Sequence, residues 1–245
     1  MTDDNKSRSL LPYLLPVRCV VFPLIFIIGA ALTQRAVEDI SNWWSVAATI
    51  VNILTIALLV VMAGREGMGY KELIDLKKGQ TPVKKAIPLI IGFVAVGMGG
   101  MYGAGLLCYG SLMPAVSLKM IAPIPAVPAV INVLLLPVTT ALAEDGLYLG
   151  CGAGRIGNKY ASVIVPALFY TLQHCFIPTI FDGGYMAYRA LSFLPLTVLF
   201  CVWYRKSRDP LPAMIAHVIL DLATAGSILS TSVIPGAYEQ MEAMM

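Results

Sequence analysis

The chain has 245 residues, of which 58% are hydrophobic and only 13% are charged, and its mean hydropathy is +0.78. A typical soluble domain carries about 25% charged residues, so this composition excludes an ordinary soluble protein and leaves no room for a separate soluble domain. It predicts an all-α, polytopic membrane protein surrounded by lipids, with no role for nucleic acid. The net charge of +3 says little by itself, because the placement of basic residues is what orients a membrane protein.

About seven apolar stretches are long enough to cross a bilayer, for which about 20 apolar residues are needed. The expected spans are 10–32, 43–63, 86–110, 121–143, 160–181, 186–204 and 210–232. Prolines interrupt several of them, so the pattern allows a helix bundle of six to eight spans. The first span carries Arg18, whose side chain we expect to extend toward the basic face of the membrane.

Three further patterns have structural interpretations. Gly99 and Gly103 lie four residues apart in the third span, a spacing that lets membrane helices pack closely. Between Tyr70 and Lys78 the apolar residues fall largely on one side, which predicts a short helix on the membrane surface or, equally well, a solvated turn. The five cysteines show no metal-ligand spacing, so we interpret them as buried apolar side chains.

The basic residues gather in alternate connections between the spans. Residues 64–85, 150–159 and 205–208 all carry an excess of Lys and Arg, and connections of this kind stay in the cytoplasm. A cytoplasmic N-terminus places all three on that side. The pattern therefore predicts a multi-pass protein of the cell (plasma) membrane, with the acidic C-terminal tail on the opposite side.

Five ionisable side chains stand out in the second half of the chain because they lie in or beside apolar spans. They are Glu144, Asp145, His174, His217 and Asp221. A charged group near the bilayer centre costs about 2.5–3.5 kcal/mol, so such groups usually pair with each other or line a wet cavity. Both histidines of the chain are among them. A histidine without a functional role would be placed at lower cost in a loop.

Helical spacing relates these residues to partners one turn away, since side chains four apart share a face. Such pairs are Glu144 with Tyr148, Tyr170 with His174, and His217 with Asp221. Three helices therefore present polar faces, and we expect these faces to meet. Each pair also has a structural alternative when taken singly: a solvated helix end at Glu144 and Asp145, a hydrogen-bonded histidine within the bundle, or a structural His–Asp pair.

The ordered set resembles the CPBP family of intramembrane proteases, also called the Abi or CAAX protease family. Its members carry Glu-Glu-x-x-x-Arg, Phe-x-x-x-His and His-x-x-x-Asn/Asp on successive membrane helices. This chain has Glu144-Asp145-x-x-Tyr148-Leu149, Tyr170-x-x-x-His174 and His217-x-x-x-Asp221. The resemblance covers about residues 112–230. It divides a single membrane domain into N-terminal helices (1–111, with the basic loop 64–85), a protease-like core (112–230) and a short tail (231–245).

The resemblance implies an intramembrane endopeptidase that hydrolyses a peptide bond of a peptide or membrane-associated protein near the cytoplasmic membrane face. Glu144 would be the general base that activates a water, and His174 would position it. His217 with Asp221 would stabilise the oxyanion. The supporting residues would be Asp145, Tyr148 and Tyr170. A carboxylate in a partly dry cavity is a better base near neutral pH, and water would reach Glu144 through the cytoplasmic end of the fourth span.

Two departures from the family pattern leave other functions open. Asp145 is one methylene shorter than the second glutamate, and Leu149 replaces the arginine, for which Arg155 in the following loop is a possible substitute. A catalytically impaired member would act as a membrane scaffold or regulator of a partner membrane protein. A small transporter is a further alternative, because intramembrane acids and histidines also serve proton relays. The absence of paired broken helices in two matching halves disfavours it.

The resemblance also raises the question of a metal. Glu144, His174 and His217 are the residue types that hold a zinc ion with an open position for water. The eukaryotic CAAX-processing members of the family are better described as metal-independent. We therefore expect no cofactor, with zinc bound by these three side chains as the alternative.

Overall fold

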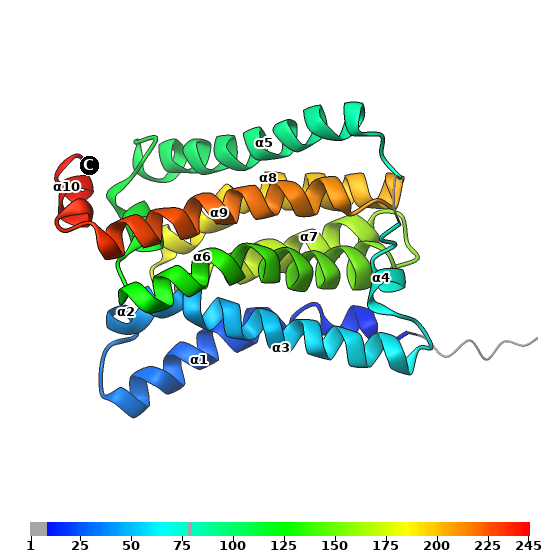
Figure 1. Ribbon diagram of the computed structural model, residues 1–245, viewed down its shortest axis with the longest axis horizontal. Coiled ribbons are helices and arrows are strands. Elements are labelled where there is room, and N and C mark those ends of the chain that lie inside the picture. Colours follow the sequence, from blue (N-terminus) through cyan, green and yellow to red (C-terminus); the bar gives the residue numbers. More distant parts are fainter. Residues whose placement is uncertain (1–8, 78–79) are drawn as a thin grey trace, which may run out of the picture.

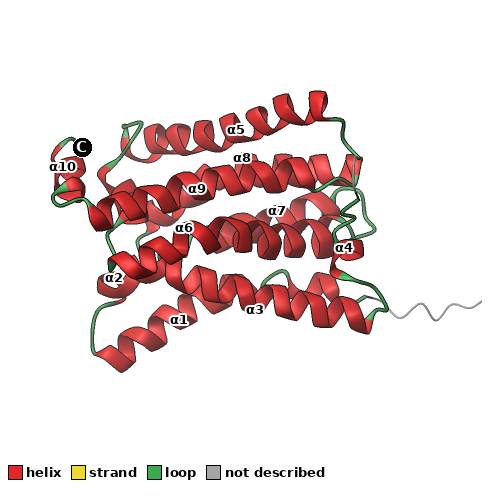
Figure 2. Ribbon diagram, viewed as in Figure 1, coloured by secondary structure: helices red, strands yellow, loops and turns green. Residues whose placement is uncertain are grey.

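The structure, a computed structural model, describes residues 9–77 and 80–245. The described residues form helices joined by short connections and contain no strand (Figure 2). Figure 1 shows the long helices side by side, running along one common direction. Large apolar side chains also cover the outside of the bundle: Leu107 and Leu134 are 79% and 69% exposed, as suits a protein surrounded by lipid. The predicted all-α, polytopic membrane bundle is confirmed.

The long segments of the described chain run along the bundle and alternate in direction (Figure 1). In chain order they are α1 (Val17–Thr33), α3 (Trp44–Arg65), α5 (Val83–Tyr109), α6 (Ala126–Thr140) with its continuation η4 (Ala141–Ala153), α7 (Ala161–His174), α8 (Gly183–Ser207) and α9 (Leu211–Val233). Shorter helical turns lie at their ends: η1 (Leu11–Leu14), α2 (Val37–Ile40), η2 (Ser41–Trp43), α4 (Tyr70–Leu73), η3 (Ala115–Ile121) and α10 (Ala237–Ala243).

Six of the described helices are long and apolar enough to cross a membrane. Among the described segments that run along the bundle, only α7 is too short. It has 14 residues, fewer than the predicted span 160–181 contains. This helix ends at His174 because the following residues, 175–179, form turns. The chain then reaches α8 over Asp182, whose carboxylate accepts a hydrogen bond from the Tyr185 amide and caps that helix. The protein is a multi-pass membrane protein with six such helices in its described part.

The two ends of the bundle differ in charge. The connections α3–α5, η4–α7 and α8–α9 lie at one end together with the first described residues, and helix α10 lies at the other (Figure 1). Together with the adjoining helix ends, these three connections make up the stretches 64–85, 150–159 and 205–208, which carry an excess of Lys and Arg. The alternation predicted from the sequence therefore holds for the described residues. The end with these connections is called the basic end below.

The segment that starts at Tyr70 is inserted into the basic end. Its helix α4 is four residues long, and both Leu73 and Ile74 are buried. The Tyr70 hydroxyl donates a hydrogen bond to the Leu142 carbonyl oxygen, and burial raises the pKa of Tyr70, which keeps this group a donor. Neither the predicted surface helix nor the solvated turn describes these residues; Lys78 lies outside the described residues.

Close packing of α5 involves glycines other than the predicted pair. A Cβ atom at Gly99 or Gly103 would meet no atom within 4 Å, whereas one at Gly100 would clash with the backbone carbonyl oxygen of Ser192 in α8. A Cβ atom at Gly97 would lie 2.9 Å from the side chain of Leu220 in α9. The third span is a helix as predicted, but the face with Gly99 and Gly103 is not the packed one. The spacing of two glycines does not indicate which face of a helix contacts a neighbouring helix.

We predict that Gly100→Ala lowers the melting temperature of the purified protein in detergent. The added methyl group forces the α5 and α8 backbones apart, and overpacking of this kind costs about 1–3 kcal/mol. Gly99→Ala, on the open face of the same helix, is the matched control and should leave the melting temperature unchanged or raise it. Equal effects of the two substitutions would contradict the described contact.

Candidate active site

The fourth pass does not end before Glu144. Helix α6 continues without a break into η4, a π-helix, so Glu144 and Asp145 lie inside the bundle with only 3% and 1% of their surface exposed. The predicted end of the span at residue 143, and the solvated helix end it allowed, are wrong. Small residues let this wide helix pack tightly: a Cβ atom at Gly152 would lie 2.6 Å from Pro166 of α7.

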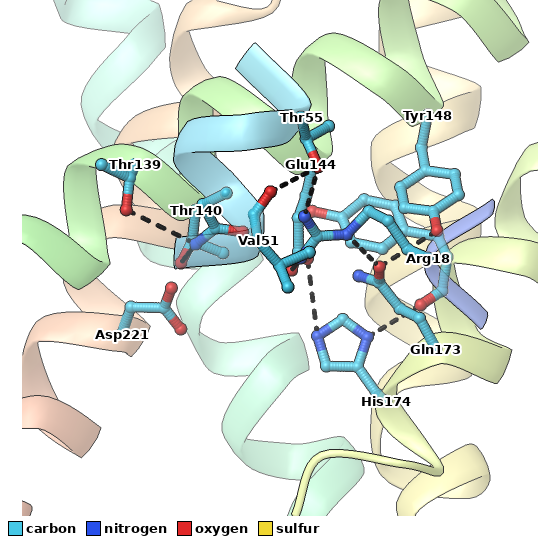
Figure 3. A network of polar contacts seen from close by, with 12 residues as sticks. Arg18, Val51, Thr55, Thr139, Thr140, Glu144, Tyr148, Gln173, His174 and Asp221 are labelled. Carbon is cyan, nitrogen blue, oxygen red and sulfur yellow. Dashed lines mark hydrogen bonds and ion pairs between the residues drawn. The ribbon is translucent and has the colours of Figure 1, made fainter. Parts of the chain in front are cut away.

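The Glu144 carboxylate is the centre of a polar cluster (Figure 3). Its Oε1 accepts a hydrogen bond from Arg18 Nη2 at 2.7 Å. Its Oε2 has no hydrogen-bond partner among the described residues and lies 3.7 Å from His174 Nε2 and 4.0 Å from His217 Nε2. These distances are too long for direct hydrogen bonds, and they place the three polar atoms close enough to act on one small polar group.

Arg18 of α1 turns into the bundle and is 1% exposed, so the predicted extension toward the basic face is wrong. Besides Glu144, it binds Gln173 Oε1 through Nε at 2.7 Å and Thr55 Oγ1 through Nη1 at 3.1 Å. A buried carboxylate offers the guanidinium a partner that lipid cannot. Sequence reasoning missed Arg18, Gln173 and Thr55 as site residues. Each is polar within an apolar stretch, which is the signal that identified the histidines.

His174 ends α7 and has a fixed ring orientation. Its Nδ1 lies 2.8 Å from the Tyr170 carbonyl oxygen, which can only accept, so Nδ1 carries a proton and Nε2 of the neutral ring presents a lone pair toward Glu144. The ring stacks on Phe193 of α8, with centroids 3.7 Å apart and planes at 19°. The predicted pairing of Tyr170 with His174 thus involves the backbone of Tyr170 and leaves its hydroxyl free for other partners.

The Tyr170 hydroxyl joins Asp145 to His217. It donates to Asp145 Oδ1 at 2.9 Å, so its oxygen accepts from His217 Nδ1, also at 2.9 Å. Three carboxylates surround the His217 ring: Asp145 Oδ2 lies 3.5 Å from Nδ1, and Asp221 Oδ2 and Glu144 Oε2 lie 3.8 Å and 4.0 Å from Nε2. Negative charges at these distances stabilise an imidazolium ring, in which both nitrogens are donors.

Tyr148 supports the cluster from the helix turn that follows Glu144. Its hydroxyl donates a hydrogen bond to Gln173 Oε1 at 3.0 Å. Its ring stacks on that of Tyr170, with centroids 4.5 Å apart and planes at 17°. The residue therefore holds two elements in place at once: the amide that binds Arg18 and the ring that carries the bridging hydroxyl.

Leu149, at the position of the family's arginine, is buried among apolar side chains. Arg155, the predicted substitute, contacts Met68 Sδ through Nη2 at 2.8 Å. Within the described residues it forms no ion pair with the acids of the cluster. The cation that does contact these acids is Arg18, which comes from the other end of the chain.

A cavity of about 310 Å³ adjoins the cluster. Its wall contains Glu144, Tyr170, His174, His217 and Asp221 together with apolar side chains of α5, α8, α9 and the connection between α5 and α6. That connection, which includes Leu112 and Met113, lies at the end opposite the basic end (Figure 1). At the basic end, Leu73 and Ile74 of the α4 insertion are buried against Gly150 of η4. The cavity therefore does not follow the predicted route through the cytoplasmic end of the fourth pass.

The described residues contain no group of three or more His, Cys, Asp or Glu side chains that could hold a metal. The Arg18 guanidinium, 2.7 Å from Glu144, would also repel a doubly charged cation bound to the same carboxylate. The proximity of Glu144, His174 and His217 is compatible with acid–base chemistry.

The alternating passes and the buried cluster define a polytopic helical protein with a polar site inside its helical bundle. Residues 126–223, from the start of α6 into α9, match the family model described as type II CAAX prenyl endopeptidase Rce1-like. This match confirms the resemblance to the CPBP (Abi/CAAX protease) family. No curated protein and no solved structure matches the chain. The matched residues contain both histidines and the three acids of the cluster, whereas Arg18 and Thr55 lie outside them.

We predict that Arg18→Gln lowers the free energy of unfolding by about 3–5 kcal/mol, because it removes the cation that is hydrogen-bonded to the buried Glu144 carboxylate. Adding Glu144→Gln should recover most of this loss, since two neutral amides can pair in the same place. The measurement is thermal unfolding of the single and double variants in detergent micelles. Losses that simply add in the double variant would contradict the buried ion pair.

Proposed function

We propose that the protein is an intramembrane endopeptidase with Glu144 as its general base. The observation that carries the proposal is the position of Glu144 Oε2, which has no hydrogen-bond partner in the described chain and lies within 4.0 Å of Nε2 of both His174 and His217. The match to the Rce1-like family supports the reaction class.

In the first step, Glu144 Oε2 removes a proton from a water molecule held between Glu144 and His174. Neutral His174 Nε2 accepts the second hydrogen of that water and aims its oxygen lone pair at the scissile carbonyl carbon. The two acceptors match the two donors of one water molecule. General base catalysis by a positioned side chain contributes about 10²–10⁴-fold to the rate.

His217 stabilises the charge that develops on the substrate. Attack of water forms a C–O bond and moves the carbonyl electron pair onto oxygen, and the imidazolium Nε2–H of His217 donates to this oxyanion. Asp145 and Asp221 stabilise the imidazolium. Asp221 therefore acts through His217, by orienting its ring. The proton held by Glu144 then passes to the leaving nitrogen as the C–N bond breaks, which yields a carboxylic acid and an amine and restores the Glu144 carboxylate.

Arg18 acts through Glu144 as a positioning residue. It binds Oε1 at 2.7 Å, which leaves Oε2 as the oxygen that faces the histidines. Gln173 and Thr55 fix the guanidinium in turn. This arrangement compensates for the leucine at the position of the family's arginine, because a cation still contacts the first acid of the motif.

We infer that the protein lies in the cell membrane with its N-terminus in the cytoplasm, because the basic connections share one end. The C-terminus then lies on the other side of the membrane, and the cavity extends from Glu144 toward that side. His217 lies in the second turn of α9, about 9 Å from the start of that helix at 1.5 Å per residue. A peptide or membrane-associated protein would enter from the far side and be cut nearer the cytoplasmic face.

We predict that the purified protein in detergent cleaves members of a peptide library and that Glu144→Gln lowers the cleavage rate about 10²-fold or more. Glutamine keeps the shape of the side chain and cannot accept the proton. Mass spectrometry identifies and counts the products. Glu239→Gln, on the exposed face of the tail helix α10, is the matched control and should keep the wild-type rate.

An unchanged rate in Glu144→Gln would contradict the assignment of the base. We also propose that no metal takes part, so EDTA or phenanthroline should leave the wild-type rate unchanged; a loss that zinc restores would contradict this. If the wild type cleaves nothing and Glu144→Gln preserves the cellular phenotype and the capture of a partner, the membrane scaffold is the function that fits.

A further inference from the structure

A second buried arginine, Arg189 of α8, lines the same cavity as Glu144 and is 3% exposed. Its Nε donates a hydrogen bond to the His174 carbonyl oxygen at 3.3 Å. Its guanidinium carbon lies 4.8 Å from the centroid of the Phe193 ring. Its Nη2 is buried and has no hydrogen-bond partner within the described chain. This guanidinium is therefore incompletely satisfied.

The other buried arginine shows how this bundle satisfies a guanidinium. Arg18 pairs with Glu144 and also binds Gln173 and Thr55. No described acid lies within ion-pair distance of Arg189. A cation inside the membrane without a counter-charge is costly, and residues of this kind mark the path or site of a ligand. Arg189, in the wall of this cavity, thus has one donor without a partner, which an anion would satisfy.

We propose that Arg189 binds a carboxylate of the substrate near the scissile bond and so determines specificity; this inference rests on the proposed peptidase function. A guanidinium presents planar donors that match the two oxygens of a carboxylate. The anionic groups of an unmodified peptide are carboxylates, either at its C-terminus or on an acidic side chain. Both sources supply the same chemistry to Arg189.

The charges around the cavity give the bound peptide a direction. The acids of the cluster surround His217 and repel an anion, whereas Arg189 contacts the backbone of His174 and attracts one. Much of the remaining wall is apolar, including Met98 and Met101 of α5. An apolar peptide segment with one carboxylate fits this wall, with its scissile carbonyl between the histidines and its carboxylate at Arg189.

The alternative is that Arg189 has a structural role only. The His174 carbonyl lies at the C-terminus of α7, where the helix dipole favours a cation. That role needs the Nε contact and the charge, but it does not involve Nη2 and it makes no distinction between charged and neutral peptides. Peptide binding can therefore separate the two roles.

Binding is measured by fluorescence anisotropy on the full-length Glu144→Gln protein in detergent micelles, with short apolar peptides that carry a neutral label. One pair, Leu-Val-Ala-Leu, ends in a carboxylate or an amide. A second pair of C-terminal amides has Asp or Asn as its second residue. We expect the charged member of at least one pair to bind about tenfold tighter or more, as for a charge-assisted hydrogen bond. The pair that discriminates identifies the source of the carboxylate.

Adding Arg189→Gln should reduce this preference to about one and leave the affinity for the neutral peptides within about twofold. Arg205→Gln is the matched control, because Arg205 lies on the same helix outside the cavity, and it should keep the preference. Arg189→Lys retains the charge at the end of α7 should the glutamine variant fail to fold. It should lower the preference about threefold, since lysine lacks the planar fork.

Equal binding of charged and neutral peptides by the Glu144→Gln protein would overturn the inference, and so would a preference that survives both Arg189 substitutions. The result is separable from the peptidase proposal. A preference for charged peptides combined with no hydrolysis by the wild type would support the carboxylate site and remove the reaction. Hydrolysis by the wild type without a preference for charged peptides would support the reaction and remove the carboxylate site.

Discussion

The bundle depends on the ion pair that keeps the Glu144 carboxylate buried. Removing a carboxylate from water costs several kcal/mol, and a cation offsets this only when its own hydrogen bonds are satisfied. Arg18 meets that condition because Gln173 and Thr55 bind its remaining nitrogens. The pair therefore joins α1, α3 and α7 to η4. It makes the N-terminal helices part of the site, although the family match begins at residue 126.

This constraint gives the two oxygens of Glu144 different surroundings. One is neutralised by Arg18, and the other faces the histidines. Nearly all of η4 is buried, so helices surround it on every side and two consecutive acids both find partners, Glu144 in Arg18 and Asp145 in the Tyr170 hydroxyl. The α4 insertion packs against η4 at the basic end, and the cavity extends the other way. The α4 insertion and the cavity thus lie on opposite sides of Glu144.

Much of the fold and part of the site could be predicted from the sequence. Apolar runs located the passes, and basic connections ordered them, because both depend on composition. The cost of charge inside a membrane selected Glu144, His174 and His217, which the structure brings together around one cavity. The remainder depends on neighbours that no local pattern reveals. Arg18 turns inward because an acid lies there, and the fourth pass continues over 144–153 because helices surround those residues.

The central claim is that Glu144 and His174 act on one water molecule. Its most direct test is the single-turnover cleavage rate of Glu144→Gln, His174→Gln and the double variant at high protein concentration. Groups that act as a unit are strongly non-additive, so the double variant should be at most about threefold slower than the slower single variant. Rate reductions that multiply in the double variant would show independent contributions and would contradict the account.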